Sequence, residues 1–175
     1  MGAWGALIMS FFAAVFAALT LYWQWHVIGP GLAAPFVPTV LIMLLAVQTI
    51  RRPGEGAAPS RRGARAIMWS SIAEGVGLFI GANVVINLHR PDLLLPTMAL
   101  VVGLHFLPIA WGASFRPFYT LGMVLIVAAV VGILAPPPIG GVISGLSAAL
   151  ALWTASALAV VRDRQAKLVT ALKTS

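Results

Sequence analysis

Residues 66–111 decide the fold class, reading AIMWSSIAEGVGLFIGANVVINL, then HRPD, then LLLPTMALVVGLHFLPIAW. Each apolar stretch is close to the roughly 20 residues that a transmembrane helix needs. The short polar turn between them leaves room only for an antiparallel return of the chain. This part of the sequence therefore predicts two consecutive transmembrane helices that form a hairpin.

The composition extends this interpretation to the whole chain of 175 residues. Hydrophobic residues make up 61% of the sequence and charged residues only 9%, which is too little charge to solvate a globule of this size. The sequence contains no cysteine, so disulfides, thiolate nucleophiles and thiolate metal sites are excluded. We expect residues 1–175 to form a single integral membrane domain without a soluble domain.

Proline, glycine and charged residues divide the apolar sequence into six predicted spans. These spans cover residues 4–25, 36–50, 66–88, 93–111, 118–134 and 139–161. Residues 51–65 form the one long loop, and residues 162–175 form a tail whose Leu168 and Leu172 have helical spacing, so it can extend the last helix along the membrane surface. The sequence predicts an all-α, polytopic membrane helix bundle of six transmembrane helices in three antiparallel hairpins.

The positive charges indicate how these spans are oriented. Ten of the eleven Lys and Arg residues fall on one predicted side, namely Arg51, Arg52, Arg61, Arg62, Arg65, Arg116, Arg162, Arg164, Lys167 and Lys173. Only Arg90 falls on the other. Under the positive-inside rule both termini are cytoplasmic, and the loop and tail face anionic lipids rather than nucleic acid. The predicted location is a bacterial inner membrane, and the first span lacks the charged region of a cleavable leader.

Glu74 is the single acid inside a predicted span, where an ionisable group is costly and marks a candidate site. It lies eight residues (74 − 66) into its span, at a depth of roughly 12 Å. His105 lies eight residues (113 − 105) before the end of the next span if that end is Ala113. Since the two spans are antiparallel neighbours, we expect the Glu74 and His105 side chains within about 4 Å of each other or joined by one water.

Further residues favour the same seam. Ser70, Glu74, Gly77 and Gly81 share one stripe of their helix, and the two glycines form a small-xxx-small packing pattern. Pro108 removes a helix amide near His105 and predicts a kink. Ser10 and Thr154 lie at a similar depth. The predicted ligand or proton site therefore comprises Glu74, His105, Ser70, Ser10 and Thr154, with Gly77, Gly81 and Pro108 setting helix packing and the kink.

The inventory of motifs argues against an enzyme. The sequence has no Walker loop, no HExxH, no GxSxG and no second carboxylate within a span. No cofactor and no metal are predicted. Three interpretations stay open. The favoured one is a transporter or ligand-binding protein that uses the polar site for a small molecule or a proton, and the second is a structural or accessory protein whose polar seam only fixes helix packing. The third and least favoured is an intramembrane enzyme. We also expect a homodimer through small residues of the last span, namely Gly141, Gly145, Ala148 and Ala149.

Residues 102–108, reading VGLHFLP, are followed by FRPFY at residues 115–119 and by Gly122. In these residues, in its length and in the acid of the preceding span, the chain resembles an uncharacterised family of small bacterial multi-spanning inner-membrane proteins with a GLHFLP-type motif. That resemblance implies a location and draws attention to His105 and Pro108, but it implies no activity. Six helices in fewer than 200 residues is also similar in size to the substrate-capture subunits of energy-coupling-factor vitamin transporters.

Overall fold

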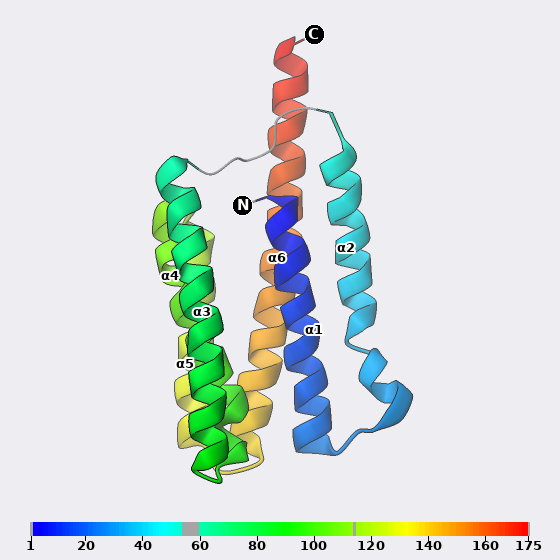
Figure 1. The fold of residues 1–175 in the computed structure, drawn as a ribbon. Coiled ribbons are helices and arrows are strands. Elements are labelled where there is room, and N and C mark those ends of the chain that lie inside the picture. Colours follow the sequence, from blue (N-terminus) through cyan, green and yellow to red (C-terminus); the bar gives the residue numbers. More distant parts are fainter. Residues whose placement is uncertain (1, 54–59, 114, 175) are drawn as a thin grey trace.

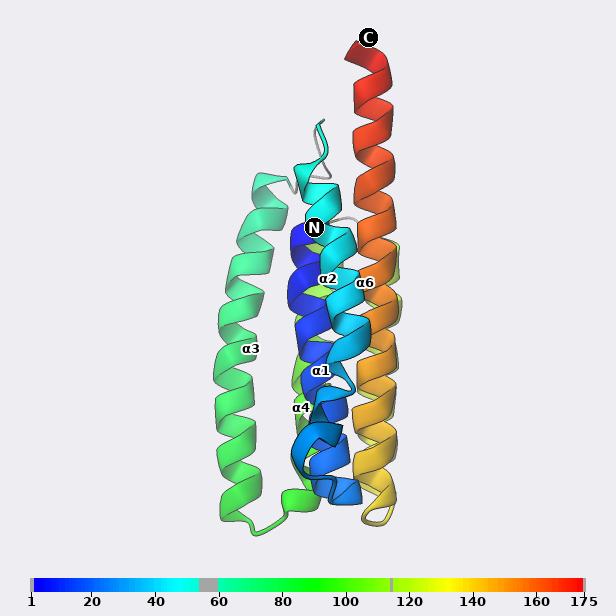
Figure 2. The same ribbon diagram turned by 90° about the vertical axis from the view of Figure 1, so that its right-hand side faces the viewer.

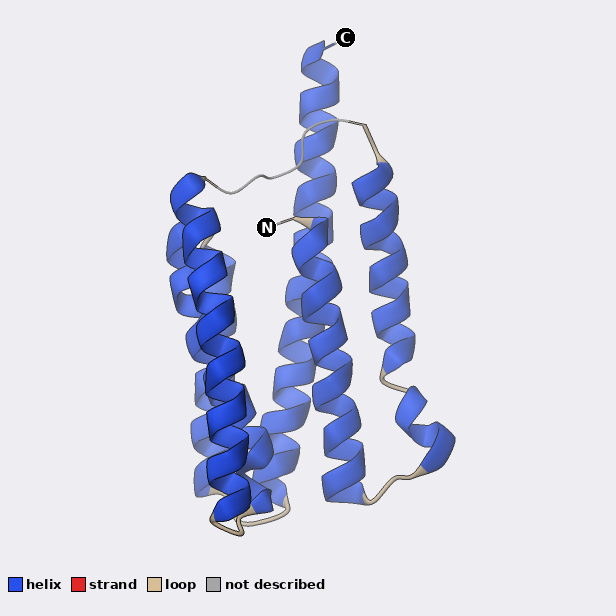
Figure 3. Ribbon diagram, in the orientation of Figure 1, coloured by secondary structure: helices blue, strands red, loops and turns tan. Residues whose placement is uncertain are grey.

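The computed structural model describes residues 2–53, 60–113 and 115–174. Its helices are α1 (Ala3–Trp25), α2 (Phe36–Arg51), α3 (Arg61–Asn87), α4 (Leu94–Ala113), α5 (Arg116–Leu134) and α6 (Ile139–Thr174), with short 3-10 helices η1 (Gly29–Ala33) and η2 (Pro91–Leu93). The described residues contain no strand (Figure 3). Six helices are long and apolar enough to cross a membrane, which confirms the predicted fold class.

The observed helix bounds differ most from the predicted spans on either side of the long loop. Helix α3 begins at Arg61, five residues before the predicted start at residue 66, because the Ser60 hydroxyl caps it by accepting a hydrogen bond of 3.1 Å from the Gly63 amide. Helix α2 is extended at its start by η1, so that Gly29–Arg51 together reach the length of a span. Residues 54–59 of the predicted loop lie outside the described residues.

Helix α6 is much longer than the predicted span. Its 36 residues correspond to about 54 Å, against a hydrocarbon thickness of about 30 Å. The tail is helical, as the leucine spacing allows, and it continues straight along the axis of α6 (Figures 1 and 2). Hydrogen bonds tie this extension to its neighbours: Asp163 accepts from the Ala3 amide, and Lys167 donates to the Ile50 and Arg52 carbonyls.

The largest helix interfaces join α1 to α6 and α4 to α5. Consecutive helices do run antiparallel, but these two interfaces pair helices of different predicted hairpins, so three separate hairpins are not the packing units of the fold. Helix α2 lies beside α1 and α6, whereas α3 packs mainly on α4 (Figures 1 and 2). The bundle is therefore a four-helix centre of α1, α4, α5 and α6 with α2 and α3 added at its sides.

The interior of this centre is filled by large apolar side chains and by close glycine contacts. Phe16, Leu125 and Leu152 are fully buried. Between α4 and α5, a Cβ at Gly103 would lie 3.0 Å from the Gly122 carbonyl oxygen, and one at Gly122 would lie 2.9 Å from the Gly103 carbonyl oxygen. The two backbones therefore touch where both residues lack a side chain.

The small residues of α6 pack inside the chain. Gly141 faces Gln24 and Gly145 faces Thr20, both on α1, while Ala148 and Ala149 are fully buried. The predicted dimer surface is therefore wrong. Small residues permit close approach of any helix, and here the helix they admit is α1 of the same chain. A homodimer itself stays a prediction without an assigned surface.

The two ends of the bundle differ in charge. The start of α1, the end of α2, the start of α3 and the extension of α6 lie at one end, and the α3–α4 and α5–α6 turns lie at the other (Figure 1). At that second end Arg90 donates to the Asp92 carboxylate at 2.8 Å, and this hydrogen bond raises the pKa of the guanidinium. Arg90, the one cation predicted to lie on this side, is therefore paired with an acid.

Candidate functional site

Helices α3 and α4 bring Ser70, Glu74 and His105 together. Ser70 and Glu74 are one helical turn apart on α3 and so share a face, and His105 lies on the antiparallel helix α4. The His105 Nδ1 atom is 3.5 Å from Glu74 Oε2 and 3.0 Å from the Ser70 hydroxyl oxygen. The predicted contact between Glu74 and His105 is confirmed, and the function of the pair stays a prediction.

Ser70 contacts His105 at two points. Its hydroxyl donates to the His105 carbonyl oxygen at 2.7 Å, and the hydroxyl oxygen also lies 3.0 Å from Nδ1 of the ring. Glu74 Oε2 faces the same nitrogen at 3.5 Å. The imidazole is therefore held between a hydroxyl and a carboxylate, and both contacts are made through Nδ1.

The three side chains are largely shielded although α3 is a peripheral helix. The His105 and Glu74 side chains are 8% and 15% exposed, and Ser70 is buried. On its other face α3 exposes apolar side chains such as Ile72 and Phe79, which suit contact with lipid. Glu74 therefore turns away from the lipid-facing side and toward a basic partner, the usual arrangement of an acid within a membrane.

The predicted packing residues lie on the same seam. A Cβ at Gly77 would lie 3.0 Å from Val101 Cγ1, and one at Gly81 would lie 2.7 Å from Thr97 Cγ2, so both glycines face α4. Helix α4 is continuous through Pro108, which lacks the amide that would bond the carbonyl of residue 104. The glycines set how closely α3 approaches α4, and the predicted kink at Pro108 stays a prediction.

Ser10 and Thr154 do not join this group, and their prediction as site residues is wrong. Ser10 donates within α1, and its carbonyl accepts a 2.8 Å hydrogen bond from Thr39 of α2. Thr154 donates within α6 and lines a groove between α5 and α6. Depth along the membrane normal, on which the prediction rested, does not fix the direction in which a side chain points around its helix.

Sequence analysis missed a polar junction at Thr39. Its hydroxyl is buried, donates to the Ser10 carbonyl and accepts a 2.9 Å hydrogen bond from Trp153 Nε1. The junction links α1, α2 and α6. The position of Trp153 in the middle of a span was the available signal, because a tryptophan N–H away from the interface needs an acceptor within the protein.

Surface cavities lie elsewhere on the bundle. One of about 620 Å³ lies between α5 and α6, and one of about 410 Å³ adjoins it. Another of about 500 Å³ lies between α3 and α4 near the start of α3. In the part of the chain that the structure describes, none of these three is lined by Ser70, Glu74 or His105. The polar site therefore belongs to none of these three cavities.

The described residues contain no group of three or more His, Asp or Glu side chains that could hold a metal ion. No protein-family model matches the chain, no curated protein matches its sequence, and no solved structure matches its fold. The resemblance to the bacterial family with a GLHFLP-type motif therefore stays a prediction. Function has to be argued from the site itself.

Proposed function

We propose that this membrane protein is of transporter type and that its Glu74–His105 pair takes up and releases a proton. The observation that carries the proposal is the contact of His105 Nδ1 with both Glu74 and Ser70. The Ser70 hydroxyl contacts Nδ1 and donates to the His105 carbonyl, which holds the imidazole against the Glu74 carboxylate. A carboxylate beside an imidazole is a common arrangement for proton relays within membranes.

The packing of the site supports a proton rather than a small molecule as its ligand. The cavities described above are lined by other residues, whereas a drug-sized ligand needs several hundred Å³. A proton needs only a donor and an acceptor within hydrogen-bond reach, linked to water by small local movements. We therefore propose only a proton as the ligand of the Glu74–His105 pair.

We further propose a bacterial inner membrane and cytoplasmic termini. The cation asymmetry of ten against one supports this orientation, as does the resemblance in the region of His105. In this orientation the Glu74 site lies nearer the cytoplasmic surface. No covalent chemistry and no cofactor are proposed.

A pH titration of the protein in lipid, followed by infrared difference spectroscopy, tests proton binding without knowledge of a substrate. We expect a carboxyl signal that titrates in the wild type and is lost in Glu74→Gln. Asp92→Asn is the matched control, because Asp92 is an acid paired with Arg90 at the other end of the bundle. An unchanged carboxyl signal in Glu74→Gln would refute proton binding at this residue.

Proton flux then tests transport. Vesicles that contain the protein and a pH-sensitive dye receive a pH jump under a clamped membrane potential. We expect faster equilibration with the wild type and with Asp92→Asn than with Glu74→Gln. Equal rates with the wild type and Glu74→Gln would leave the proton-binding site without a role in transport.

A structural role is the second candidate, and one observation favours it. Helix α3 packs mainly on α4, so the Glu74–His105 contact and the two glycines hold a peripheral helix in register. Under this alternative Glu74→Gln is mild, since the amide keeps the shape and can still hydrogen-bond, whereas Glu74→Leu destabilises because it leaves His105 without that partner. Thermal unfolding of both variants beside the infrared titration separates the two candidates.

A further inference from the structure

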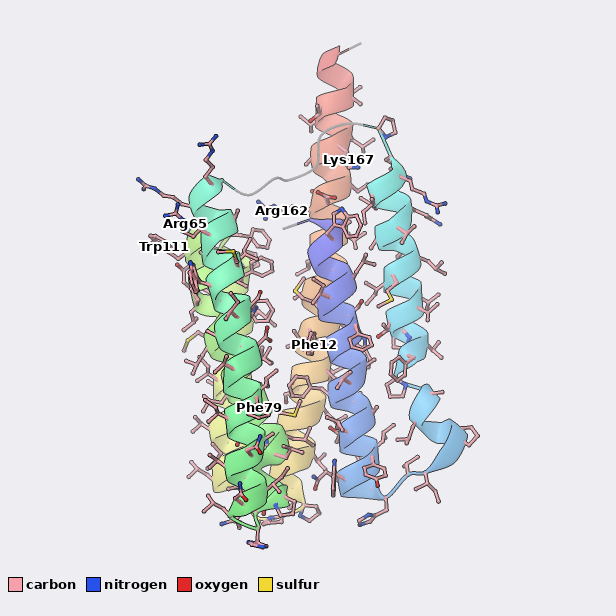
Figure 4. All side chains as sticks on the ribbon, in the orientation of Figure 1. Phe12, Arg65, Phe79, Trp111, Arg162 and Lys167 are labelled. Atoms are coloured by element: carbon pink, nitrogen blue, oxygen red, sulfur yellow. The ribbon has the colours of Figure 1, made fainter. Side chains whose placement is uncertain are left out.

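A second polar cluster lies where α3 begins and α4 ends, apart from the Glu74 site. Its cavity of about 500 Å³ is lined by Arg61, Arg62, Arg65, Ala66, Trp69 and Trp111. Arg65 and Trp111 project to the same side of the bundle (Figure 4). The proposed proton exchange uses none of these residues, so this cavity, here called the arginine pocket, needs its own explanation.

Backbone contact between the two helices shapes the arginine pocket. A Cβ at Gly112 would lie 2.7 Å from the Ala66 Cβ and 3.1 Å from the Gly63 Cα, so α3 and α4 approach closely here, with only the Ala66 methyl group and the Gly63 backbone facing Gly112. Ser60 fixes the first turn of α3 by capping the Gly63 amide. The arginines and tryptophans around the pocket are therefore carried by packed helix ends.

The pocket concentrates positive charge that the described residues do not neutralise. No acid lines it in the described part of the chain. Glu74 is nine residues (74 − 65) beyond the last of the three arginines, Asp92 pairs with Arg90 at the other end, and Asp163 accepts from the start of α1. Cations in the first turns of a helix do not stabilise it, since the macrodipole is positive there. Among the described residues no acid lines the cavity of these three arginines, so an anion from outside the chain can serve as their partner.

The surface beside the pocket indicates a lipid. Trp69 and Trp111 are 61% and 67% exposed, as is typical of side chains at a membrane–water interface. From Trp69 a stripe of exposed apolar side chains follows α3 toward its other end through Ile72, Val76 and Ile80. A soluble anion would use only the charged part of this surface, whereas a phospholipid would use both parts.

We propose that the arginine pocket binds the phosphate of an anionic phospholipid whose acyl chains lie along the apolar stripe of α3. The three guanidinium groups donate hydrogen bonds to the phosphate oxygens, for which their planar geometry is suited. The two tryptophans border the region between the headgroup and the acyl chains. The lipid would bridge α3 and α4 at the end where Gly63 and Gly112 meet.

Binding of short-chain lipids to the full chain in detergent tests the proposal. The probes are dioctanoyl phosphatidylglycerol, dioctanoyl phosphatidylcholine as the zwitterionic control, and glycerol 3-phosphate as the headgroup without acyl chains. The pocket variant is Arg61→Gln/Arg62→Gln/Arg65→Gln, and the charge-matched control is Arg51→Gln/Arg52→Gln/Arg164→Gln. We expect the pocket variant to weaken phosphatidylglycerol binding at least about tenfold and the control variant less than about twofold.

Three results would overturn the proposal. Equal weakening in both triple variants would indicate general charge attraction. Equal affinity of the wild type for both lipids would remove the selectivity for a headgroup of net negative charge, since both lipids carry a phosphate. Equally tight binding of glycerol 3-phosphate would identify a soluble anion as the ligand. If the triple variant does not yield folded protein, Arg65→Gln against Arg164→Gln makes the same comparison. This experiment is independent of the infrared titration of Glu74.

Discussion

Ser70 is the residue that connects the two helices of the candidate site most directly. It donates to the His105 carbonyl and contacts Nδ1 of the ring, and both contacts are shielded from solvent. The sequence indicated Ser70 only because it shares a stripe with Glu74. In the structure Ser70 has a more definite role, because it holds both the backbone and the ring of the histidine.

Ser70→Ala is expected to lower the free energy of unfolding by about 1 kcal/mol, because the His105 ring loses its shortest partner while Glu74 remains. Ser71→Ala is the matched control, since Ser71 is the exposed neighbour on the same helix. Thermal unfolding in detergent measures the difference. Nitrogen NMR of labelled histidine should also show a changed Nδ1 environment in Ser70→Ala. Identical unfolding of the two variants would contradict the assigned hydrogen bonds.

At the same scale, Lys167 is a buried cation that donates to the Ile50 and Arg52 carbonyls, each at 2.9 Å. Lys167→Met should destabilise the chain by about 1–3 kcal/mol, because two carbonyls lose a charged donor. Hydrogen exchange should increase at the end of α2, where both acceptors lie. Arg164→Met, which alters an exposed neighbour, should change stability by less than about 0.5 kcal/mol. Unchanged exchange at the end of α2 in Lys167→Met would count against the contact.

At the scale of elements, glycines determine which helices come close. Gly103 and Gly122 bring the α4 and α5 backbones together, Gly112 brings α4 against α3, and Gly145 brings α6 against α1. The sequence indicates such positions but not their partners. The same type of residue that suggested a dimer surface on α6 instead packs that helix into the centre of the bundle.

Gly122→Ala is expected to destabilise the bundle by about 1–3 kcal/mol, since the new Cβ would meet the Gly103 carbonyl oxygen and the helices would have to separate. Gly75→Ala is the control, because a Cβ there meets nothing within 4 Å. Alanine favours helix over glycine by up to about 1 kcal/mol, so Gly75→Ala should be neutral or stabilising. Thermal unfolding of both variants is the measurement, and equal melting would show that the α4–α5 contact tolerates a methyl group.

At the scale of the whole molecule, the bundle places both described ends of the chain, the end of α2 and the start of α3 at the same side (Figure 1). We predict that this side is cytoplasmic, because it carries the arginines that surround the long loop and the extension of α6. Topology reporters inserted after Pro59 and after Ser175 should report inside, and one inserted after Arg90 should report outside. An outside signal at either of the first two positions would reverse the orientation.

The sequence by itself determined the membrane class, the six helices and the contact between Glu74 and His105. Hydrophobic length and charge placement are properties of each segment, and the lipid environment enforces them on every span separately. The Glu74–His105 contact could also be predicted from the sequence. A short turn forces α3 and α4 to be neighbours, and residue counting then shows that the two side chains lie at the same depth in the membrane. Residue counting did not predict the partners of Ser10 and Thr154, because no short turn forces α1 or α6 to be a neighbour of α3.

Only the tertiary structure decided which helices pack against each other and how each helix is rotated about its own axis. It set α1 against α6 and α4 against α5, left α3 with α4 as its main partner, and brought Arg65 and Trp111 to one pocket from separate helices. In a membrane, apolar side chains gain little by leaving lipid for protein, so the choice of partner depends on close packing and a few hydrogen bonds. Those depend on the rotation of each helix, which no single segment of sequence specifies.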